Sequence, residues 1–210
     1  MDHGEDRGER DQDHLVDLIR RRWKQDQFSP EIIRRVEGIL DINTVEHRVP
    51  GAESARGFLP ITSLASHSCA SNSIKDKTNP KFVITRARTK ILKGEEITFH
   101  YTGGLKGRFM RRKALKAGWF FWCSCSRCSS PSEQGSEINT LICSSCSGLV
   151  RPVSPLDQES IYSCEGCKDE LSAKEAENRE QELTKQLESF YRKKGFLRSS
   201  SWMGWRRAWS

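Results

Sequence analysis

The stretch that decides the fold is Cys143-Ser-Ser-Cys146, followed after 17 residues by Cys164-Glu-Gly-Cys167. Two residues between cysteines let one tight turn aim both sulfurs at a single tetrahedral metal ion. The separation of the two pairs is typical of paired zinc-binding turns. Two local disulfides are the alternative, but they would leave this segment without an anchor. The spacing therefore predicts a zinc site with Cys143, Cys146, Cys164 and Cys167 as its ligands.

The four other cysteines are Cys69 and the run Cys123-Ser-Cys125-Ser-Arg-Cys128. Three close thiolates leave a tetrahedral zinc site one ligand short, and Cys69 is the cysteine that remains to complete it. A buried free thiol is an equally good interpretation of Cys69, because free cysteine is often buried. Residue counting alone leaves the two interpretations balanced.

Composition narrows the class of protein. The chain has 210 residues, of which 35% are hydrophobic and 30% charged, and its apolar runs are too short for a membrane-spanning helix. Its first residues are charged rather than apolar, so we expect no secretory signal, a cytoplasmic or nuclear location, and cysteines that bind metal rather than form disulfides.

The positive charge of the chain is concentrated at its C-terminal end. Six positive charges of the net +7 belong to residues 192–210, which leaves +1 for the rest. We therefore expect no nucleic-acid partner except through this tail.

The local pattern predicts an α+β fold. Ser29-Pro30 is a helix start, and Ile32, Ile33, Val36 and Leu40 are expected on its buried face. Strands are expected at 82–88 and 96–101. A basic helix is expected over 105–117, ending at Gly118. Ser172 and Glu175 form a capping box that opens a long charged helix.

Two further segments carry a resemblance to a known family. The run Ser66-His-Ser-Cys-Ala-Ser-Asn72 resembles the first signature motif of SET-domain lysine methyltransferases, and Gly94-Glu-Glu-Ile-Thr-Phe-His-Tyr101 resembles the second. The run Cys123–Cys128 follows where that family has its post-SET zinc cluster. Within the family the chain is most similar to the SMYD group, and in particular to arthropod SMYD-like (msta-type) proteins.

The resemblance implies a role for several residues. Tyr101 matches the catalytic tyrosine, whose hydroxyl lies near the transferred methyl group. The positions matching those that bind S-adenosylmethionine are Asn43, Ser66, His67, Tyr101, Trp119 and Phe121. The resemblance also implies that Cys69 shares one zinc ion with Cys123, Cys125 and Cys128. Core packing is the alternative for the aromatic residues.

The chain also departs from the family pattern. Residues 1–66 contain no Gly-x-Gly cofactor loop, and no cysteine precedes Cys69, so we expect the N-terminal half of the SET domain and the MYND zinc finger to be absent. Ser66 stands where the family usually has Asn. These departures favour a truncated, inactive chain over an active enzyme. Three functions stay open: an S-adenosylmethionine-dependent protein-lysine N-methyltransferase acting on histone or non-histone lysines, a catalytically inactive zinc-binding interaction module, and a nucleic-acid binder that uses the basic tail.

The expected organisation is a partial SET-domain β core with a post-SET zinc site, a small four-cysteine zinc module and flanking helices. The expected segments are a charged leader and helix (1–28), the C-terminal part of a SET domain (29–122), post-SET (123–130), the zinc module (138–170), a charged helix (171–198) and a disordered tail (199–210).

Overall fold

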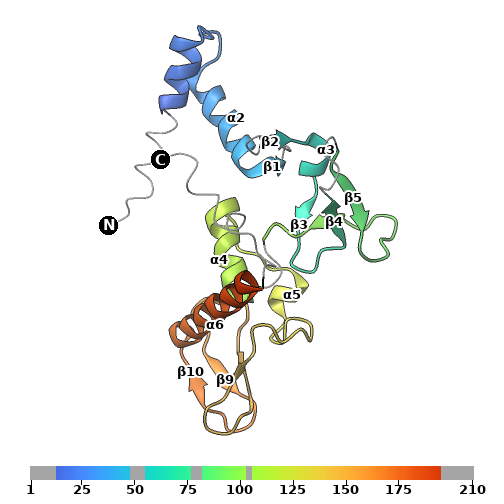
Figure 1. Cartoon of the computed structure of the whole chain (residues 1–210), viewed down its shortest axis with the longest axis vertical. Coiled ribbons are helices and arrows are strands. Elements are labelled where there is room, and N and C mark those ends of the chain that lie inside the picture. The colour runs from blue at the N-terminus through green and yellow to red at the C-terminus, as the bar shows by residue number, and fades with distance from the viewer. Residues whose placement is uncertain (1–12, 48–54, 77–81, 103–105, 195–210) are drawn as a thin grey trace. The chain divides into compact units, whose positions relative to one another are not determined.

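The computed structural model describes residues 13–47, 55–76, 82–102 and 106–194 (Figure 1). The chain divides into two compact units. The first comprises Met1–Ser66, Lys75–Arg86 and Gly94–Glu96, and the second His67–Ile74, Ala87–Lys93 and Ile97–Ser210. The predicted leader before residue 13 and the predicted tail at 199–210 lie outside the described residues. The predicted domain boundaries stay predictions.

The first unit is mainly helical. Residues 13–17 are helical and continue into a π-helical turn, η1 (Leu18–Arg22). The next elements are α2 (Pro30–Asn43), β1 (Thr44–His47), β2 (Ala55–Phe58) and α3 (Pro60–Ser63). Strands β1 and β2 pair antiparallel, with Thr44 opposite Phe58. The chain has two further strand pairs, β3 (Ser66–His67) with β6 (Thr98–Phe99) and β4 (Ser73–Asp76) with β5 (Ile84–Ala87), of which β6 belongs to the second unit.

Helix α2 starts where the sequence predicts but buries less than expected. The Ser29 side chain accepts a hydrogen bond from the Ile32 backbone N–H, as an N-cap residue should. Of its apolar side chains only Ile33 is buried, while Ile32 and Val36 are about half exposed. The prediction of a wide buried face, Leu40 included, is therefore wrong. The sheet that follows has two four-residue strands, which are too small to cover a 14-residue helix.

The second unit combines helices with a small sheet. Besides β6, it contains α4 (Arg108–Trp119), α5 (Ser126–Ser129), β7 (Leu141–Ile142), β8 (Leu149–Pro152), β9 (Tyr162–Cys164), β10 (Glu170–Leu171) and α6 (Ala173–Lys193). The sheet is antiparallel in the order β10-β9-β8-β7. Ala176 of α6 packs with Leu141, Val150 and Cys164 in one core, and α6 also contacts α4 (Figure 1).

Two helix ends in this unit test the sequence predictions. The Ser172–Glu175 capping box is present, with both of its reciprocal hydrogen bonds. Helix α4, however, runs through Gly118 and ends at Trp119, with Phe120 as its C-cap at a left-handed φ of 61°. The prediction that Gly118 stops the helix is wrong, because a glycine inside a helix costs only about 1 kcal/mol relative to alanine. Across the described ranges, no helix is both long and apolar enough to span a bilayer.

Candidate metal centres and an aromatic cluster

The first group of four cysteines is assembled from separate parts of the chain. Cys69 follows β3, Cys123 and Cys125 follow α4, and Cys128 lies in α5. Their four sulfurs all lie within 4.8 Å of one another. The Cys69 sulfur lies 3.5 Å from that of Cys128 and 4.0 Å from that of Cys123. A zinc ion bonded to four sulfurs at about 2.3 Å places them about 3.8 Å apart, whereas a disulfide bond is about 2.05 Å long. We call this group the first cluster, and its geometry fits a metal ion rather than disulfides.

The thiols of the first cluster oppose one another's ionisation. Hydrogen bonds with Cys123 and then Cys125 hold the pKa of Cys69 far above its ordinary value. Hydrogen bonds from Cys123, Cys128 and Cys69 hold the pKa of Cys125 far below it. A bound divalent cation is what would allow all four sulfurs to be anionic.

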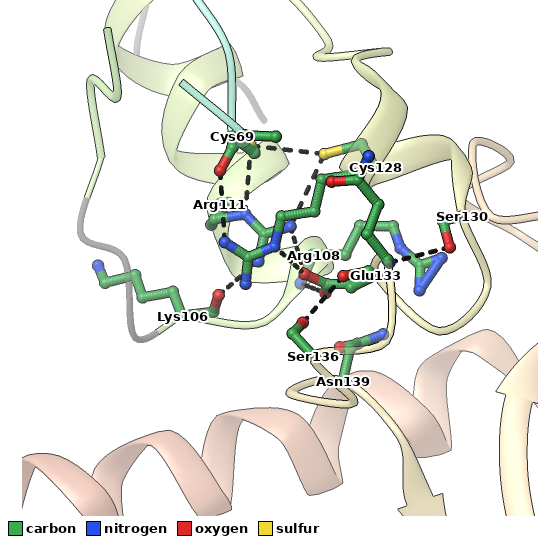
Figure 2. Close-up of polar contacts among 12 residues, drawn as sticks. Cys69, Lys106, Arg108, Arg111, Cys128, Ser130, Glu133, Ser136 and Asn139 are labelled. Carbon is green, nitrogen blue, oxygen red and sulfur yellow. Dashed lines mark hydrogen bonds and ion pairs between the residues drawn. The ribbon is translucent and has the colours of Figure 1, made fainter. Parts of the chain in front are cut away.

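A buried arginine contacts this cluster. Arg111, in the first turn of α4, has a fully buried side chain. Its Nε donates to the Cys69 sulfur at 3.2 Å, and its Nη2 lies 3.8 Å from the Cys128 sulfur. Nη1 donates to the carbonyl of Lys106 at 2.6 Å, and Nη2 lies 2.7 Å from Oε2 of Glu133 (Figure 2). The guanidinium group thus joins the cluster to a buried carboxylate.

Glu133 and Glu180 together satisfy the start of helix α4. The helix begins after Gly107, which has no side chain to serve as a cap. Oε1 of Glu133 accepts from the Arg108 backbone N–H at 2.8 Å, and Oε1 of Glu180 accepts from that of Met110 at 3.1 Å. Negative groups at a helix N-terminus are stabilising, because the first N–H groups have no partner within the helix. Burial raises the pKa of Glu180 to about 7.

The buried charges around the first cluster do not balance without it. Within the described part of the chain, three arginines and two glutamates are buried: Arg108, Arg111, Arg112, Glu133 and Glu180. The raised pKa of Glu180 adds to the positive surplus near neutral pH. Four thiolates around a divalent cation carry a net charge of about −2. A metal-bound cluster therefore supplies negative charge that the buried arginines otherwise lack.

The second cluster, formed by Cys143, Cys146, Cys164 and Cys167, lies at the tips of two hairpins. The first pair lies between β7 and β8, whereas Cys164 is the last residue of β9 and Cys167 lies between β9 and β10. The sulfur of Cys143 lies 3.6 Å from that of Cys167, and the sulfur of Cys146 lies 3.4 Å from that of Cys164. All four sulfurs lie within 4.8 Å of one another. This geometry also suits a tetrahedral metal ion.

The two hairpin tips of the second cluster repeat one backbone design. The amide of Cys143 donates to the Gly148 carbonyl and the amide of Cys164 to the Asp169 carbonyl, five residues on in both cases. The carbonyls of the same two cysteines accept from Ser147 and Lys168, four residues on. Ser147 and Lys168 both adopt left-handed backbone angles, with φ of 60° and 66°. Each tip is thus a closed loop that directs two sulfurs to one point.

An aromatic cluster adjoins the first cluster. The ring of His67 lies 5.1 Å from that of Tyr101 and 6.0 Å from that of Phe121, and the Tyr101 ring lies 5.3 Å from that of Trp119. Tyr101, Trp119 and Phe121 all pack against the buried cysteines. The structure therefore brings together four of the residues that the sequence assigns to the cofactor site.

His67 also contacts the metal cluster. Its Nδ1 accepts a hydrogen bond from the Tyr101 backbone N–H at 3.0 Å, so the proton of the neutral ring is on Nε2. Nε2 lies 3.2 Å from the Cys69 sulfur and donates to it. Burial, followed by the nearby His100, lowers the pKa of His67 to about 4. His67 and Arg111 thus donate to the same sulfur.

Asn43 and Ser66 lie in the first unit. The side-chain amide of Asn43 donates to the Ile39 carbonyl at 2.9 Å and so closes the end of α2. Ser66 is the first residue of β3. Their assignment to a cofactor site, like that of the other site residues, stays a prediction.

Sequence reasoning missed the residues that surround the first cluster. Arg111 sits in a run of basic residues that is typical of a solvated helix face, and Glu133 lies in a Ser/Pro/Gly-rich stretch of a kind that is typical of linkers. Glu133 is almost fully buried, with φ of 51°. The burial of these two charged side chains cannot be predicted from one sequence, because it depends on contacts with distant segments.

Comparison with curated proteins identifies the relatives of the chain. It is 35% identical over 138 residues to SET domain-containing protein SmydA-8, isoform A, of Drosophila melanogaster, which covers 63% of this chain and 30% of that protein. It is 30% identical over 147 residues to histone-lysine N-methyltransferase Smyd1 of Mus musculus, covering 61% and 30%. It is 34% identical over 73 residues to histone-lysine N-methyltransferase ASHR1 of Arabidopsis thaliana, covering 35% and 15%.

These matches bear out the family expected from the motifs. No family model matches the chain. The chain spans 30% of the length of SmydA-8 isoform A and 25% of isoform B. Its two four-cysteine clusters are compatible with zinc binding. The homologues of this chain are SET-domain proteins of the SMYD type.

Proposed function

We propose that this chain is part of a SET-type protein-lysine N-methyltransferase that uses S-adenosylmethionine and is held together by two structural zinc ions. The observation that carries the proposal is the aromatic cluster of His67, Tyr101, Trp119 and Phe121 built against the first cysteine cluster. Relatives named histone-lysine N-methyltransferases support the reaction class.

Both cysteine clusters suit zinc in a structural role. Four thiolates form a closed coordination shell, which leaves no position for a water molecule or a substrate. In the first cluster Cys69, Cys123 and Cys128 are buried, so this metal would fasten α4 and α5 to the segment after β3. In the second cluster the metal would join the two hairpin tips that carry its ligands. The zinc ions therefore contribute to folding rather than to chemistry.

The aromatic cluster suits a sulfonium cofactor and an amine substrate. S-adenosylmethionine supplies a positively charged sulfonium methyl group, and aromatic faces attract cations. The lysine amine must be neutral to attack, although its ordinary pKa is about 10.4. An apolar ring environment disfavours the ammonium form, and the Tyr101 hydroxyl can accept or donate a hydrogen bond that orients the amine. Rate would come mainly from holding the two reactants at the attacking distance and angle.

The proposed substrate is a lysine side chain of a protein, histone or non-histone, in the cytoplasm, the nucleus or both. A catalytically inactive zinc-binding interaction module is the second candidate. Exposed apolar side chains near the second cluster favour it, because Ile142 and Val153 are each 59% exposed. Such side chains on a small domain are suited to contact a protein partner.

The test is a calorimetric titration of the zinc-loaded full chain with S-adenosylmethionine, followed by transfer of a labelled methyl group to histones and peptides. Micromolar binding, with methyl transfer that Tyr101→Phe abolishes while zinc content stays unchanged, would support the enzymatic proposal. Tyr191→Phe, on α6 and away from the aromatic cluster, is the matched control and should leave transfer unchanged. Absence of binding at millimolar cofactor, or full activity of Tyr101→Phe, would overturn the enzymatic proposal and favour the interaction module.

A further inference from the structure

The side chain that sets the first cluster apart is Arg111. It has no exposed surface, and its three nitrogens face two cysteine sulfurs, one carbonyl and one carboxylate. Burying a guanidinium group is costly unless each donor finds an acceptor and its charge is balanced. Arg111 meets both conditions only because the sulfurs of Cys69 and Cys128 and the carboxylate of Glu133 surround it (Figure 2).

The contact with Cys69 is the informative one. Cys69 is separated by 54 residues from the next cysteine of the cluster, whereas the other three lie within six residues. The turn that spaces Cys123, Cys125 and Cys128 therefore places three sulfurs but leaves the fourth to tertiary contacts. The Nε of Arg111 and the Nε2 of His67 both lie 3.2 Å from the Cys69 sulfur. Two N–H donors thus fix where this ligand sits.

The positive charge of Arg111 favours the metal-bound state of the first cluster over its metal-free state. An N–H group of an arginine bonds a thiolate much more strongly than a neutral thiol, because both partners are then charged. The same donors offset part of the negative charge that four thiolates bring to one ion. Arg111 therefore gains most when the cluster is ionised, which is the state that a metal requires.

We propose that Arg111 is a positioning residue of the first metal centre: its two N–H···S contacts hold Cys69 and Cys128 on the ion, and its ion pair with Glu133 ties the centre to the start of α4. This inference rests on zinc binding as put forward under Proposed function. Glu133 completes the link, since its other oxygen accepts the first backbone N–H of the helix. Loss of metal from the first cluster should thus loosen the N-terminus of α4.

The experiment follows zinc release from the full zinc-loaded chain into excess chelator. Cys146 and Cys167 are exposed, whereas three cysteines of the first cluster are buried, so we expect a fast phase from the second cluster and a slow phase from the first. Cys146→Ser assigns the fast phase, because it removes that phase alone. The second cluster is then an internal control in every variant.

Arg111→Met removes the donors and the charge but keeps the length of the side chain. We expect the slow phase to accelerate about 10- to 100-fold, as is usual when a residue that orients a metal ligand is lost, with the fast phase unchanged. Arg111→Lys, which keeps the charge but not the fork of donors, should fall in between. Arg112→Lys is the matched control: Arg112 is a buried arginine on the same helix, and its Nε donates to the Cys123 carbonyl rather than to a sulfur.

A second variant distinguishes an effect on zinc release from an effect on folding. Arg111→Met leaves the buried Glu133 with one fewer partner, which alone could unfold α4. The double variant Arg111→Met with Glu133→Gln removes this buried negative charge, which Arg127 alone would otherwise pair, and keeps an oxygen for the Arg108 N–H. We expect it to retain wild-type helix content by circular dichroism and still to release the slow zinc faster.

The outcomes are distinct. A wild-type chain that binds no zinc at the first cluster would overturn the zinc proposal and this inference with it. A wild-type chain that binds two zinc ions, with a slow phase unaltered in the folded double variant, would overturn this inference alone. Acceleration in Arg112→Lys equal to that in Arg111→Met would also overturn it, because the effect would then not depend on the N–H···S contacts.

Discussion

The two cysteine clusters reach the same sulfur geometry by different means. The first gathers ligands up to 59 residues apart and holds them with buried side chains that carry charge, chiefly Arg111 and Glu133. The second lies within Cys143–Cys167 and holds its ligands with two copies of one backbone loop. The difference teaches that a metal centre built on local loops is nearly self-contained. One assembled across the chain depends on the packing of everything that carries its ligands.

Removing one ligand from each centre tests directly whether the two centres differ in how much stability they give the chain. Cys69→Ser should lose the first zinc ion and more than about 4 kcal/mol of unfolding free energy, because the segment after β3 is then no longer fastened to α4 and α5. Cys146→Ser should lose the second zinc ion with a smaller change in the rest of the unit. Zinc content by elemental analysis and chemical denaturation measure both effects. Equal losses of stability would contradict the distinction between the two centres.

Helices α4 and α6 contact each other, and Gly107, the N-cap residue of α4, lies close to Glu180 of α6. A Cβ at this position would lie 2.4 Å from Oε1 of Glu180 and 2.7 Å from Oδ1 of Asn139, both buried residues. Gly107→Ala should therefore cost about 2 kcal/mol of unfolding free energy. Gly118→Ala is the matched control on the same helix, because its Cβ would meet nothing within 4 Å. This control should instead stabilise the helix by about 0.5–1 kcal/mol. A neutral Gly107→Ala would mean that the helices are not packed this closely.

The same contact should depend on pH. Burial raises the pKa of Glu180 to about 7, with Glu133 adding to the effect and Arg111 and Arg108 opposing it. The folded chain therefore binds this proton more tightly than the unfolded chain, so the contribution to stability is complete below about pH 4.5 and is lost as pH rises through 7. Between pH 6 and 8 the wild-type chain should lose about 1.4 kcal/mol.

Glu180→Gln should remove that pH dependence while keeping an oxygen for the Met110 N–H. Urea denaturation of the zinc-loaded chain at pH 6 and pH 8 measures it. A variant that loses as much stability as the wild type over this interval would show that another group titrates.

The smallest expected effect concerns the N-cap of α6, the helix that packs against the sheet holding the second cluster. Ser172 caps α6, and its side chain accepts from the Glu175 backbone N–H at 3.3 Å. Ser172→Ala should cost about 1 kcal/mol of unfolding free energy, with no loss of zinc, because the cap lies outside the hairpin tips. Ser189→Ala, at a non-terminal position of the same helix, is the control and should change stability little. Zinc loss in Ser172→Ala would show that the second centre relies on α6 more than its local loops suggest.

Local chemistry made several features predictable from sequence. The Ser29 cap, the Ser172–Glu175 box and the strand around Ile84–Ala87 are confirmed, because each depends on a few adjacent residues. The spacing of Cys143–Cys167 likewise predicted a compact cluster. Features set by distant contacts were not predictable. The exposure of Ile32 and Val36, and the burial of Arg111 beside sulfur, depend on which segments pack together, and one sequence does not encode that in its local pattern.

We infer that the chain carries two metal centres, one supported by buried side chains from distant segments and the other by local backbone loops. Native mass spectrometry measures this on the full chain, purified with zinc under reducing conditions and then treated with chelator for increasing times. We expect two zinc ions per chain, lost in two separate steps, with the exposed second cluster emptied before the buried first one. A chain that carries no zinc, or that loses both ions in a single step, would contradict it.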